Sequence, residues 1–157
     1  MKLKKIISGG QTGADQGGLI AAALRQIKTG GHAPHGYKTL EGTNYRLKAV
    51  FGLEEHPSPS YPPRTDANVK NSDATIRFAV KFNSPGEKCT LRAIRSHKKP
   101  YLDIDIENPL SPVEVADWII SNKVEILNIA GNSERTYPGA EMFVVSFLLK
   151  VFDEMKE

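Results

Sequence analysis

The sequence predicts a three-layer α/β fold, in which helices cover both faces of a doubly wound parallel sheet of about five strands. Short apolar segments alternate along the chain with segments rich in helix formers, and this alternation is typical of parallel βαβ units. The segment 126–130 is almost entirely apolar, as expected for a strand that helices cover on both faces. The expected strands are residues 3–8, about 27–31, 73–80, 100–105 and 124–130. Numbered along the chain, we expect them in the spatial order 2-1-3-4-5, with right-handed crossovers.

Local signals predict where the helices begin. The segments 84–87 and 111–114 both read Ser-Pro-x-Glu, a capping box with proline at the first helical position. Thr12 and Asp15 have the spacing of a third box, with aspartate in place of glutamate. A long C-terminal helix is expected after Gly139, where the apolar periodicity begins.

A proline-rich stretch interrupts the alternation between the second and third expected strands. Residues 52–65 contain four of the ten prolines, and proline cannot donate a hydrogen bond into a strand ladder or a helix interior. We therefore expect a surface loop there, followed by a short helix from about 65 to 72. Neither side of this loop holds a complete sheet, so residues 1–157 are expected to form a single ligand-binding domain.

Composition narrows the class of protein. The chain carries 21 basic and 18 acidic side chains, an excess too small to predict a nucleic-acid partner. The longest apolar stretch, residues 142–149, is too short to span a bilayer, so no membrane partner is expected. The single cysteine, Cys89, fits a reducing compartment, and residues 1–6 do not have the pattern of a signal peptide. We therefore expect a cytoplasmic location.

Three polar, glycine-bearing loops fall where expected strands end, at residues 9–15, 83–90 and 131–139. Each leads directly into a helix, whose first N–H groups and partial positive charge attract anions. Glycine lets the backbone approach such an anion closely. The first loop lacks both the Gly-x-Gly-x-x-Gly spacing and a following Gly-Lys-Ser/Thr, so neither a dinucleotide fingerprint nor a P-loop is present. A tight turn with a capping threonine is the alternative for that loop.

The expected ligand is a phosphorylated small molecule held by these loops at the carboxyl edge of the sheet. Arg64, at the end of the proline-rich stretch, is a candidate phosphate clamp because a guanidinium binds phosphate bidentately. The candidate ligand-binding residues are Gly9, Gly10, Gln11, Thr12, Gly13, Asp15, Arg64, Ser84, Pro85, Gly86, Thr90, Gly131, Asn132, Ser133 and Glu134.

Other residues carry weaker alternatives. Cys89 is either a nucleophile or, as we favour, a buried apolar residue of its helix. His32 and His35 are either a metal pair or part of a polar loop, and we favour the loop because no acidic or cysteine ligand stands nearby at ligand spacing. Asp103 and Asp105 could hold a ribose, a metal or a base, although a solvated strand end is favoured. We expect no catalytic residue and no tightly bound metal.

Residues 7–17, Ile-Ser-Gly-Gly-Gln-Thr-Gly-Ala-Asp-Gln-Gly, resemble the opening of the molybdenum carrier family. The resemblance continues in order through residues 29–37, 61–72, 72–75, 84–86 and 127–131. It implies a Rossmann-like fold. It also implies a protein that binds molybdenum cofactor (molybdopterin), a pterin carrying a terminal phosphate.

A wider resemblance is to the cytokinin-activating phosphoribohydrolases, often labelled lysine decarboxylase-like. Their signature is Pro-Gly-Gly-x-Gly-Thr-x-x-Glu, and residues 85–93 keep Pro85, Gly86 and Thr90 of it. Ala93 stands where the family has its glutamate, which acts on the reacting sugar. The resemblance implies cleavage of the N-glycosidic bond of a nucleoside monophosphate, and Ala93 argues against that activity here.

The leading hypothesis is a molybdenum cofactor carrier that binds a phosphorylated pterin or nucleotide-like ligand and performs no chemistry. The alternative is a nucleotide-processing hydrolase, similar to a nucleoside monophosphate N-glycosidase, in which Asp15, Glu87 or Glu134 supplies a carboxylate. A nucleotide sensor is a third hypothesis. The sequence alone leaves carrier, sensor and hydrolase open, as well as the identity of the ligand.

The expected C-terminal helix is apolar on more than one side. Its main stripe suits docking on the sheet, and Met142, Val145 and Leu149 form a second row on a different face. We expect a homo-oligomer that uses this row, most simply a twofold dimer. The alternative is that a neighbouring helix of the same subunit covers it.

Overall fold

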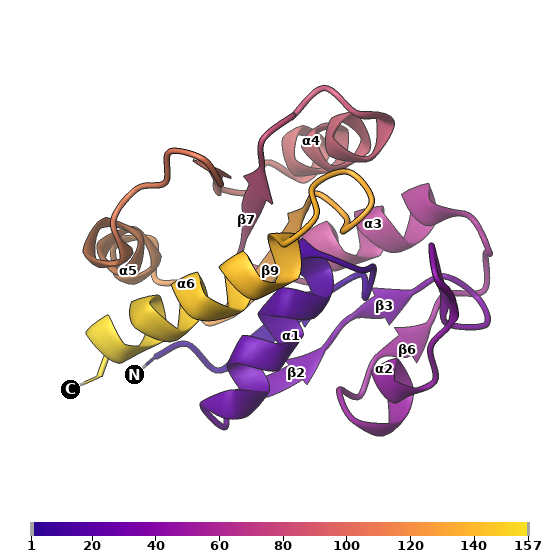
Figure 1. The fold of residues 1–157 in the computed structure, drawn as a ribbon, viewed down its shortest axis with the longest axis horizontal. Coiled ribbons are helices and arrows are strands. Elements are labelled where there is room, and N and C mark those ends of the chain that lie inside the picture. Colours follow the sequence, from indigo (N-terminus) through magenta and orange to yellow (C-terminus); the bar gives the residue numbers. More distant parts are fainter. Residues whose placement is uncertain (1, 157) are drawn as a thin grey trace.

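The computed structural model describes residues 2–156 and contains a central sheet of five parallel strands (Figure 1). The strands are β1 Lys5–Ser8, β2 Lys28–Gly30, β7 Ala74–Ala79, β8 Tyr101–Asp105 and β9 Ile126–Gly131. Each overlaps a segment expected from the sequence, and the parallel α/β sheet is confirmed.

The expected strand order is wrong. The sheet runs β2-β1-β9-β7-β8, which is 2-1-5-3-4 when the strands are numbered along the chain, so β9 lies between β1 and β7. Burial explains this arrangement. Leu127, Asn128 and Ile129 of β9 are buried, whereas Asp103 and Asp105 are exposed on β8, which is an edge strand. The crossover rule restricts the hand of a connection but does not fix which strands become neighbours.

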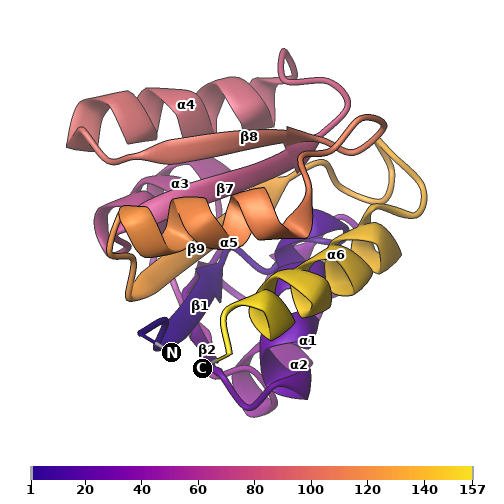
Figure 2. The ribbon, with the colours of Figure 1, turned by 90° about the vertical axis from the view of Figure 1, so that its left-hand side faces the viewer.

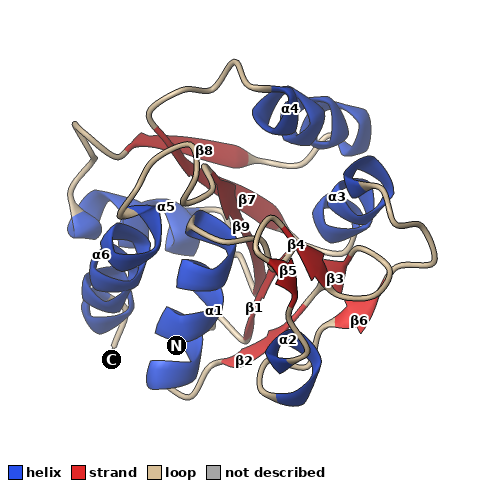
Figure 3. Cartoon of the chain, turned by 45° about the vertical axis from the view of Figure 1, so that its right-hand side comes forward, coloured by secondary structure: helices blue, strands red, loops and turns tan. Residues whose placement is uncertain are grey.

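Helices cover both faces of the sheet, which confirms the three-layer arrangement (Figures 2 and 3). On one face lie α1 Ala14–Leu24, α5 Pro112–Ser121 and α6 Ala140–Glu154, and on the other lie α3 Tyr61–Lys70 and α4 Pro85–His97. The long helix α6 packs against both α1 and α5. Within residues 2–156, no helix has the length and apolar character needed to cross a membrane.

The main hydrophobic core lies between the sheet and the α1, α5 and α6 layer. Ile6, Phe78 and Leu127, from three strands, are fully buried in it together with residues of all three helices. Phe78 stacks edge to face on Phe147 of α6, with 5.7 Å between ring centroids. This core fixes α6 on the sheet through its main apolar stripe, as the sequence indicates.

The serine caps of two of the three expected capping boxes are confirmed. The N–H of Glu87 donates to Ser84 Oγ over 3.3 Å, and the N–H of Glu114 donates to Ser111 Oγ over 3.2 Å. A proline follows each serine in the first turn, where the helix needs no N–H donor. The starts of α4 and α5 are therefore local properties of the sequence.

The third expected box, Thr12 with Asp15, is wrong. α1 begins after Gly13, whose φ of 87° is left-handed, and no side chain caps the helix. Asp15 turns back to accept a hydrogen bond from the N–H of Gln11, and Thr12 Oγ1 accepts one from Glu134. Both side chains hold loops instead of the helix start.

Helix α3 begins inside the stretch that the sequence predicts to be a loop, so the expected loop is too long. The helix follows Ser60 and has Pro62 and Pro63 in its first turn. Proline is tolerated at these positions because the first N–H groups of a helix have no intrahelical partner.

Short elements that were not expected fill the chain between β2 and α3. They are β3 His32–Ala33, β4 Lys38–Thr39, β5 Gly42–Thr43, α2 Arg46–Ala49 and β6 Glu54–Glu55. β3 pairs with β6 in parallel, and β4 pairs with β5 in an antiparallel hairpin. Tyr37, Leu47 and Leu53 of this region form a second, smaller core with Leu19 of α1. This core supports the glycine-rich turn between β1 and α1.

Candidate functional site

A cavity of about 400 Å³ lies at the carboxyl edge of the sheet, between the start of α1, the helices α3 and α4, and the loop after β9. The residues that line it are Gln11, Asp15, Leu40, Tyr61, Pro62, Arg64, Thr65, Ser84, Pro85, Gly86, Glu87, Cys89, Thr90, Ala130, Gly131, Ser133 and Thr136. Volumes of this size are typical of small-molecule sites. The cavity is at the edge where ligands of open parallel sheets bind.

The structure brings all three predicted loops and Arg64 to this cavity. The predicted residues that line it are Gln11, Asp15, Arg64, Ser84, Pro85, Gly86, Thr90, Gly131 and Ser133. The remaining predicted residues, which do not line it, are Gly9, Gly10, Thr12, Gly13, Asn132 and Glu134. The insertion of β9 does not separate the loops because all strands are parallel and end at one edge.

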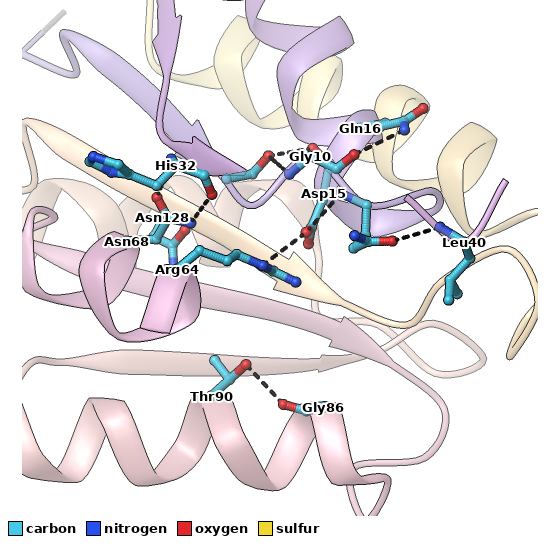
Figure 4. A network of polar contacts seen from close by, with 12 residues as sticks. Gly10, Asp15, Gln16, His32, Leu40, Arg64, Asn68, Gly86, Thr90 and Asn128 are labelled. Atoms are coloured by element: carbon cyan, nitrogen blue, oxygen red, sulfur yellow. Dashed lines mark hydrogen bonds and ion pairs between the residues drawn. The ribbon is translucent and has the colours of Figure 1, made fainter. Parts of the chain in front are cut away.

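The floor of the cavity carries a buried ion pair between Asp15 and Arg64. Asp15 Oδ2 lies 3.6 Å from Arg64 Nη1 and accepts a hydrogen bond of 3.2 Å from the N–H of Gln11 (Figure 4). Burial raises the pKa of Asp15 from 3.8 to about 6, although Arg64 opposes the rise. The negative charge of Glu87 raises the pKa further. Asp15 is therefore an acid that ionises close to neutral pH.

Arg64 reaches the floor from α3 and keeps unused donors. Its guanidinium lies 5.4 Å from the ring centroid of Tyr61, and its buried Nε has no hydrogen-bond partner among residues 2–156. A Cβ added to Gly9 would lie only 1.7 Å from Arg64 Nη1. Gly9 therefore makes room for the guanidinium instead of approaching a ligand itself.

Glu87 brings a second carboxylate to the cavity, from the first turn of α4. Its Oε2 accepts hydrogen bonds from Ser84 Oγ at 2.6 Å and from Asn132 Nδ2 at 3.3 Å. The sequence pointed to Glu87 as a site residue only in the hydrolase alternative. Its place in a capping box pointed to the helix start and gave no signal that the side chain also lines a cavity.

In the loop after β9, the carboxylate of Glu134 binds backbone N–H groups at the start of α6. Glu134 accepts hydrogen bonds from the N–H groups of Gly139 and Glu141, at 2.9 and 2.7 Å. Asn132 is also occupied internally, because its amide bonds Val80 N–H and the carbonyl of Lys81. These two predicted residues hold the loop that carries Gly131 and Ser133.

Gly10 and Gly13 face protein atoms. A Cβ on Gly10 would lie 2.8 Å from a methyl group of Leu47, and a Cβ on Gly13 would lie 2.3 Å from the carbonyl oxygen of Asn132. Both glycines have positive φ, at 76° and 87°. Their conformation is required by packing between loops, so it is no indication of contact with a ligand.

Gln11 ties the β4–β5 hairpin to the glycine-rich turn. Its Nε2 donates to the carbonyl of Lys38 and its Oε1 accepts from the N–H of Leu40, both at 3.1 Å. Arg135 also donates to the carbonyl of Leu40, at 3.2 Å. Leu40 lines the cavity, so the hairpin forms one of its walls. Nothing in the local sequence of this short hairpin predicted that position.

The two histidines of the expected polar loop have separate partners. His32 Nε2 lies 3.4 Å from Glu54 Oε2, and His35 Nδ1 lies 3.6 Å from Glu55 Oε2. Within residues 2–156, no three His, Cys, Asp or Glu side chains are grouped to hold a metal ion.

The weaker site candidates on strand β8 and helix α4 have defined contacts in the structure. Asp103 binds the buried Arg77 bidentately, with both N–O distances 2.7 Å, so it balances a core charge. Asp105 accepts the N–H of Glu107 at the strand end. Cys89 is half-buried and lines the cavity. It also borders a second hollow between α3 and α4, which Pro62, Asp66 and Arg92 help to line.

Comparison with known proteins agrees with this architecture. A crystal structure of a protein described as a putative molybdenum carrier protein, from Syntrophus aciditrophicus SB, has a TM-score of 0.84 and 31% sequence identity. The match covers 99% of this chain and 96% of that one. No curated protein gives a match. Residues 6–152 match the model of the circularly permuted YpsA SLOG family, and the chain therefore belongs to that family.

Proposed function

We propose that the protein is a carrier that binds molybdenum cofactor and holds its phosphorylated pterin in the cavity at the carboxyl edge of the sheet. The observation that carries the proposal is the convergence of three loops and Arg64 on one cavity of about 400 Å³. The name of the similar Syntrophus aciditrophicus protein supports the choice of cargo.

The residues of the cavity fit the organic part of this cargo. Arg64 has an unpartnered buried Nε and further donors for a carbonyl or phosphate oxygen. Leu40, Tyr61 and Pro62 give apolar wall surface, which suits a flat ring system. We therefore assign recognition to the pterin and its phosphate, and treat molybdenum as part of the cargo.

The test is native mass spectrometry after anaerobic purification, followed by transfer of any bound cofactor to a cofactor-free molybdenum enzyme. We expect a bound pterin with the wild type and none with Arg64→Ala. Arg92→Ala is the matched control, because Arg92 is an exposed residue of α4 that does not line the cavity. A wild type that neither retains nor takes up added cofactor would overturn the proposal.

We further propose that the carrier acts in the cytoplasm as a homo-oligomer, without a nucleic-acid or membrane partner. The second apolar row of α6 supports the oligomer: Met142 is exposed and Val145 is half-buried, although Leu149 packs on the core. Light scattering of the purified protein tests it.

A nucleoside monophosphate N-glycosidase is the second candidate, and the Asp15 carboxylate favours it. An acid with a pKa of about 6 beside Arg64 can take a proton from water as the water attacks C1′ and the base leaves. Ala93 has no carboxylate and lies outside the cavity, so the glutamate of the phosphoribohydrolases has no counterpart at this position and Asp15 would have to act without it. Incubation with AMP and chromatography for adenine tests this candidate. We expect no adenine, and release that Asp15→Asn abolishes would establish the hydrolase instead.

A further inference from the structure

The charges on the cavity floor are two carboxylates and one guanidinium. Among the described residues that line the cavity, only Asp15, Glu87 and Arg64 are charged groups. All three side chains are buried or nearly so. A phosphate group at this depth would meet two carboxylates, and like charges in a buried site repel strongly. The floor therefore suits a ligand group that donates hydrogen bonds.

The helix ends that line or adjoin the cavity carry carboxylates of the chain itself. Glu87 folds back to Ser84 at the start of α4, and Glu134 accepts two N–H groups at the start of α6. An anionic ligand would have to compete with these side chains for the same positive ends. These positive helix ends are therefore already occupied, and the floor is left for an uncharged group that exchanges hydrogen bonds.

The floor offers donors and acceptors side by side. An ionised carboxylate accepts up to about four hydrogen bonds. Asp15 Oδ2 accepts one from Gln11 N–H and lies 3.6 Å from Arg64, which leaves acceptor capacity. Arg64 has five N–H donors, and its Nε is unpartnered. The complementary ligand edge has an acceptor next to two donors.

We propose that the floor recognises the aminopyrimidinone edge shared by pterins and guanine. Arg64 donates to the ring carbonyl oxygen, and Asp15 accepts from the adjacent ring N–H and the exocyclic amine. The inference rests on the proposed function, since it needs the ligand in this cavity. It adds the orientation, with the heterocycle inside and the phosphate toward the mouth.

The composition of the walls agrees with a flat heterocycle. Tyr61, Pro62 and Leu40 line the cavity and carry apolar surface. Figure 4 shows Arg64 of α3 pointing toward Asp15, with Leu40 to one side. A ring that enters between these walls meets the Asp15 and Arg64 pair with its polar edge.

The test compares pterin with lumazine, which has a carbonyl oxygen in place of the exocyclic amine. Binding to the wild type is measured by calorimetry at neutral pH. We expect pterin to bind at least about tenfold more tightly, because lumazine sets an acceptor against the carboxylate. Equal affinities would overturn the proposal, and this comparison needs no variant.

Variants assign the discrimination to a residue. Asp15→Asn should reduce the preference for pterin over lumazine to less than threefold, as one acceptor becomes a donor. Asp66→Asn is the matched control, because Asp66 is an exposed carboxylate of α3 that pairs with His97 and does not line the cavity. It should retain the full preference. Loss of the preference in both variants, or in neither, would overturn the assignment.

Binding of further compounds distinguishes the two heterocycles that carry the aminopyrimidinone edge, pterin and guanine. Tight binding of pterin together with weak binding of GMP supports a pterin cargo. Tight binding of GMP together with weak binding of AMP supports a guanine nucleotide as the ligand. Molybdenum cofactor bound equally by the wild type and Asp15→Asn would overturn the inference and leave the carrier proposal standing. Asp15-dependent GMP binding without any bound cofactor would overturn the carrier proposal and support the inference. Displacement of pterin by inorganic phosphate would place an anion on the floor and overturn the inference.

Discussion

The guanidinium of Arg64 occupies the space that a side chain at position 9 would need. A Cβ built on Gly9 would lie 1.7 Å from Arg64 Nη1 and 2.5 Å from Cζ. The glycine at the end of β1 and the arginine of α3 therefore depend on each other. Arg64 keeps its place beside Asp15 only because residue 9 has no side chain.

Gly9→Ala is expected to displace Arg64 and weaken pterin binding by about ten- to a hundredfold, the range for loss of a hydrogen bond to a charged group. Calorimetry measures the affinity. The control is the double variant with Arg64→Ala. If position 9 acts through Arg64, adding Gly9→Ala to Arg64→Ala should cost no further affinity. A full additional loss would show an independent role for Gly9.

Gly10→Ala is expected to destabilise the fold by about 2–4 kcal/mol, from backbone strain and overpacking together. Its φ is 76°, and the new Cβ would lie 2.8 Å from Leu47. Urea unfolding measures the free energy. Gly36→Ala is the matched control, because Gly36 has a φ of 78° and open space for a Cβ. A Gly10 variant no less stable than the Gly36 variant would contradict the packing role.

Asp15 is expected to make stability depend on pH in a direction unusual for an aspartate. Its pKa rises from 3.8 to about 6 on folding, so between these two pH values the folded protein holds a proton that the unfolded chain has released. The stabilising contribution is full below 3.8 and is lost as the pH rises through about 6. Asp15→Asn should therefore gain on the order of 3 kcal/mol relative to the wild type above that pH.

Urea unfolding at a series of pH values measures this gain, which should vanish in acid. Asp153→Asn is the control, because Arg25 lowers the pKa of Asp153 at the surface. It should show no gain above pH 6, where Asp15→Asn does. An Asp15→Asn protein less stable than the wild type at neutral pH would contradict the burial cost.

Gln11→Ala is expected to release the β4–β5 hairpin from the cavity. The N–H of Leu40 loses its acceptor, so its hydrogen exchange should accelerate by about tenfold. Gln16→Ala is the matched control, because Gln16 bonds the carbonyl of Gly10 and does not contact the hairpin. Equal exchange at Leu40 in both variants would show that Arg135 alone holds the hairpin.

Met142→Glu is expected to convert a homo-oligomer into a folded monomer by light scattering. Met142 is 78% exposed, whereas Leu149 packs on the core, so Met142 can be changed without loss of packing. Val50→Glu is the control, since Val50 is the exposed C-cap residue of α2 and α2 lies apart from α6 (Figure 1). A wild type that is monomeric at high concentration would disprove the oligomer.

The elements of the sheet layer were predictable from local patterns, but their order was not. Ser84 and Ser111 mark helix starts through contacts within four residues. Which strands become neighbours in the sheet depends on contacts between residues far apart in the sequence. One usable signal was the alternation of Asp103 and Asp105, since a strand with exposed charges suits a sheet edge. An apolar β9 suits the interior for the same reason.

The cavity was predictable as a place, and only partly as a set of residues. Parallel strands end at one edge, so the loops that follow them meet. A glycine with positive φ serves loop packing as readily as ligand approach, and Gly10 and Gly13 serve packing. Leu40 was missed because its hairpin has two residues in each strand and little periodicity to detect.

The central position of β9 sets the order in which the protein can be assembled during synthesis. Ser8 of β1 and Ile76 of β7 both pair with Ile129, so no hydrogen-bonded contact joins the two halves of the sheet without β9. Until this strand leaves the ribosome, the sheet can form only as two separate strand pairs. One pair is β1 with β2, the other is β7 with β8, and each keeps an unpaired edge. Closing so long a loop is slow, and open edges invite pairing with other chains. The nascent chain therefore exposes the most unpaired strand edge, and is most prone to aggregation, just before its last strand is synthesised.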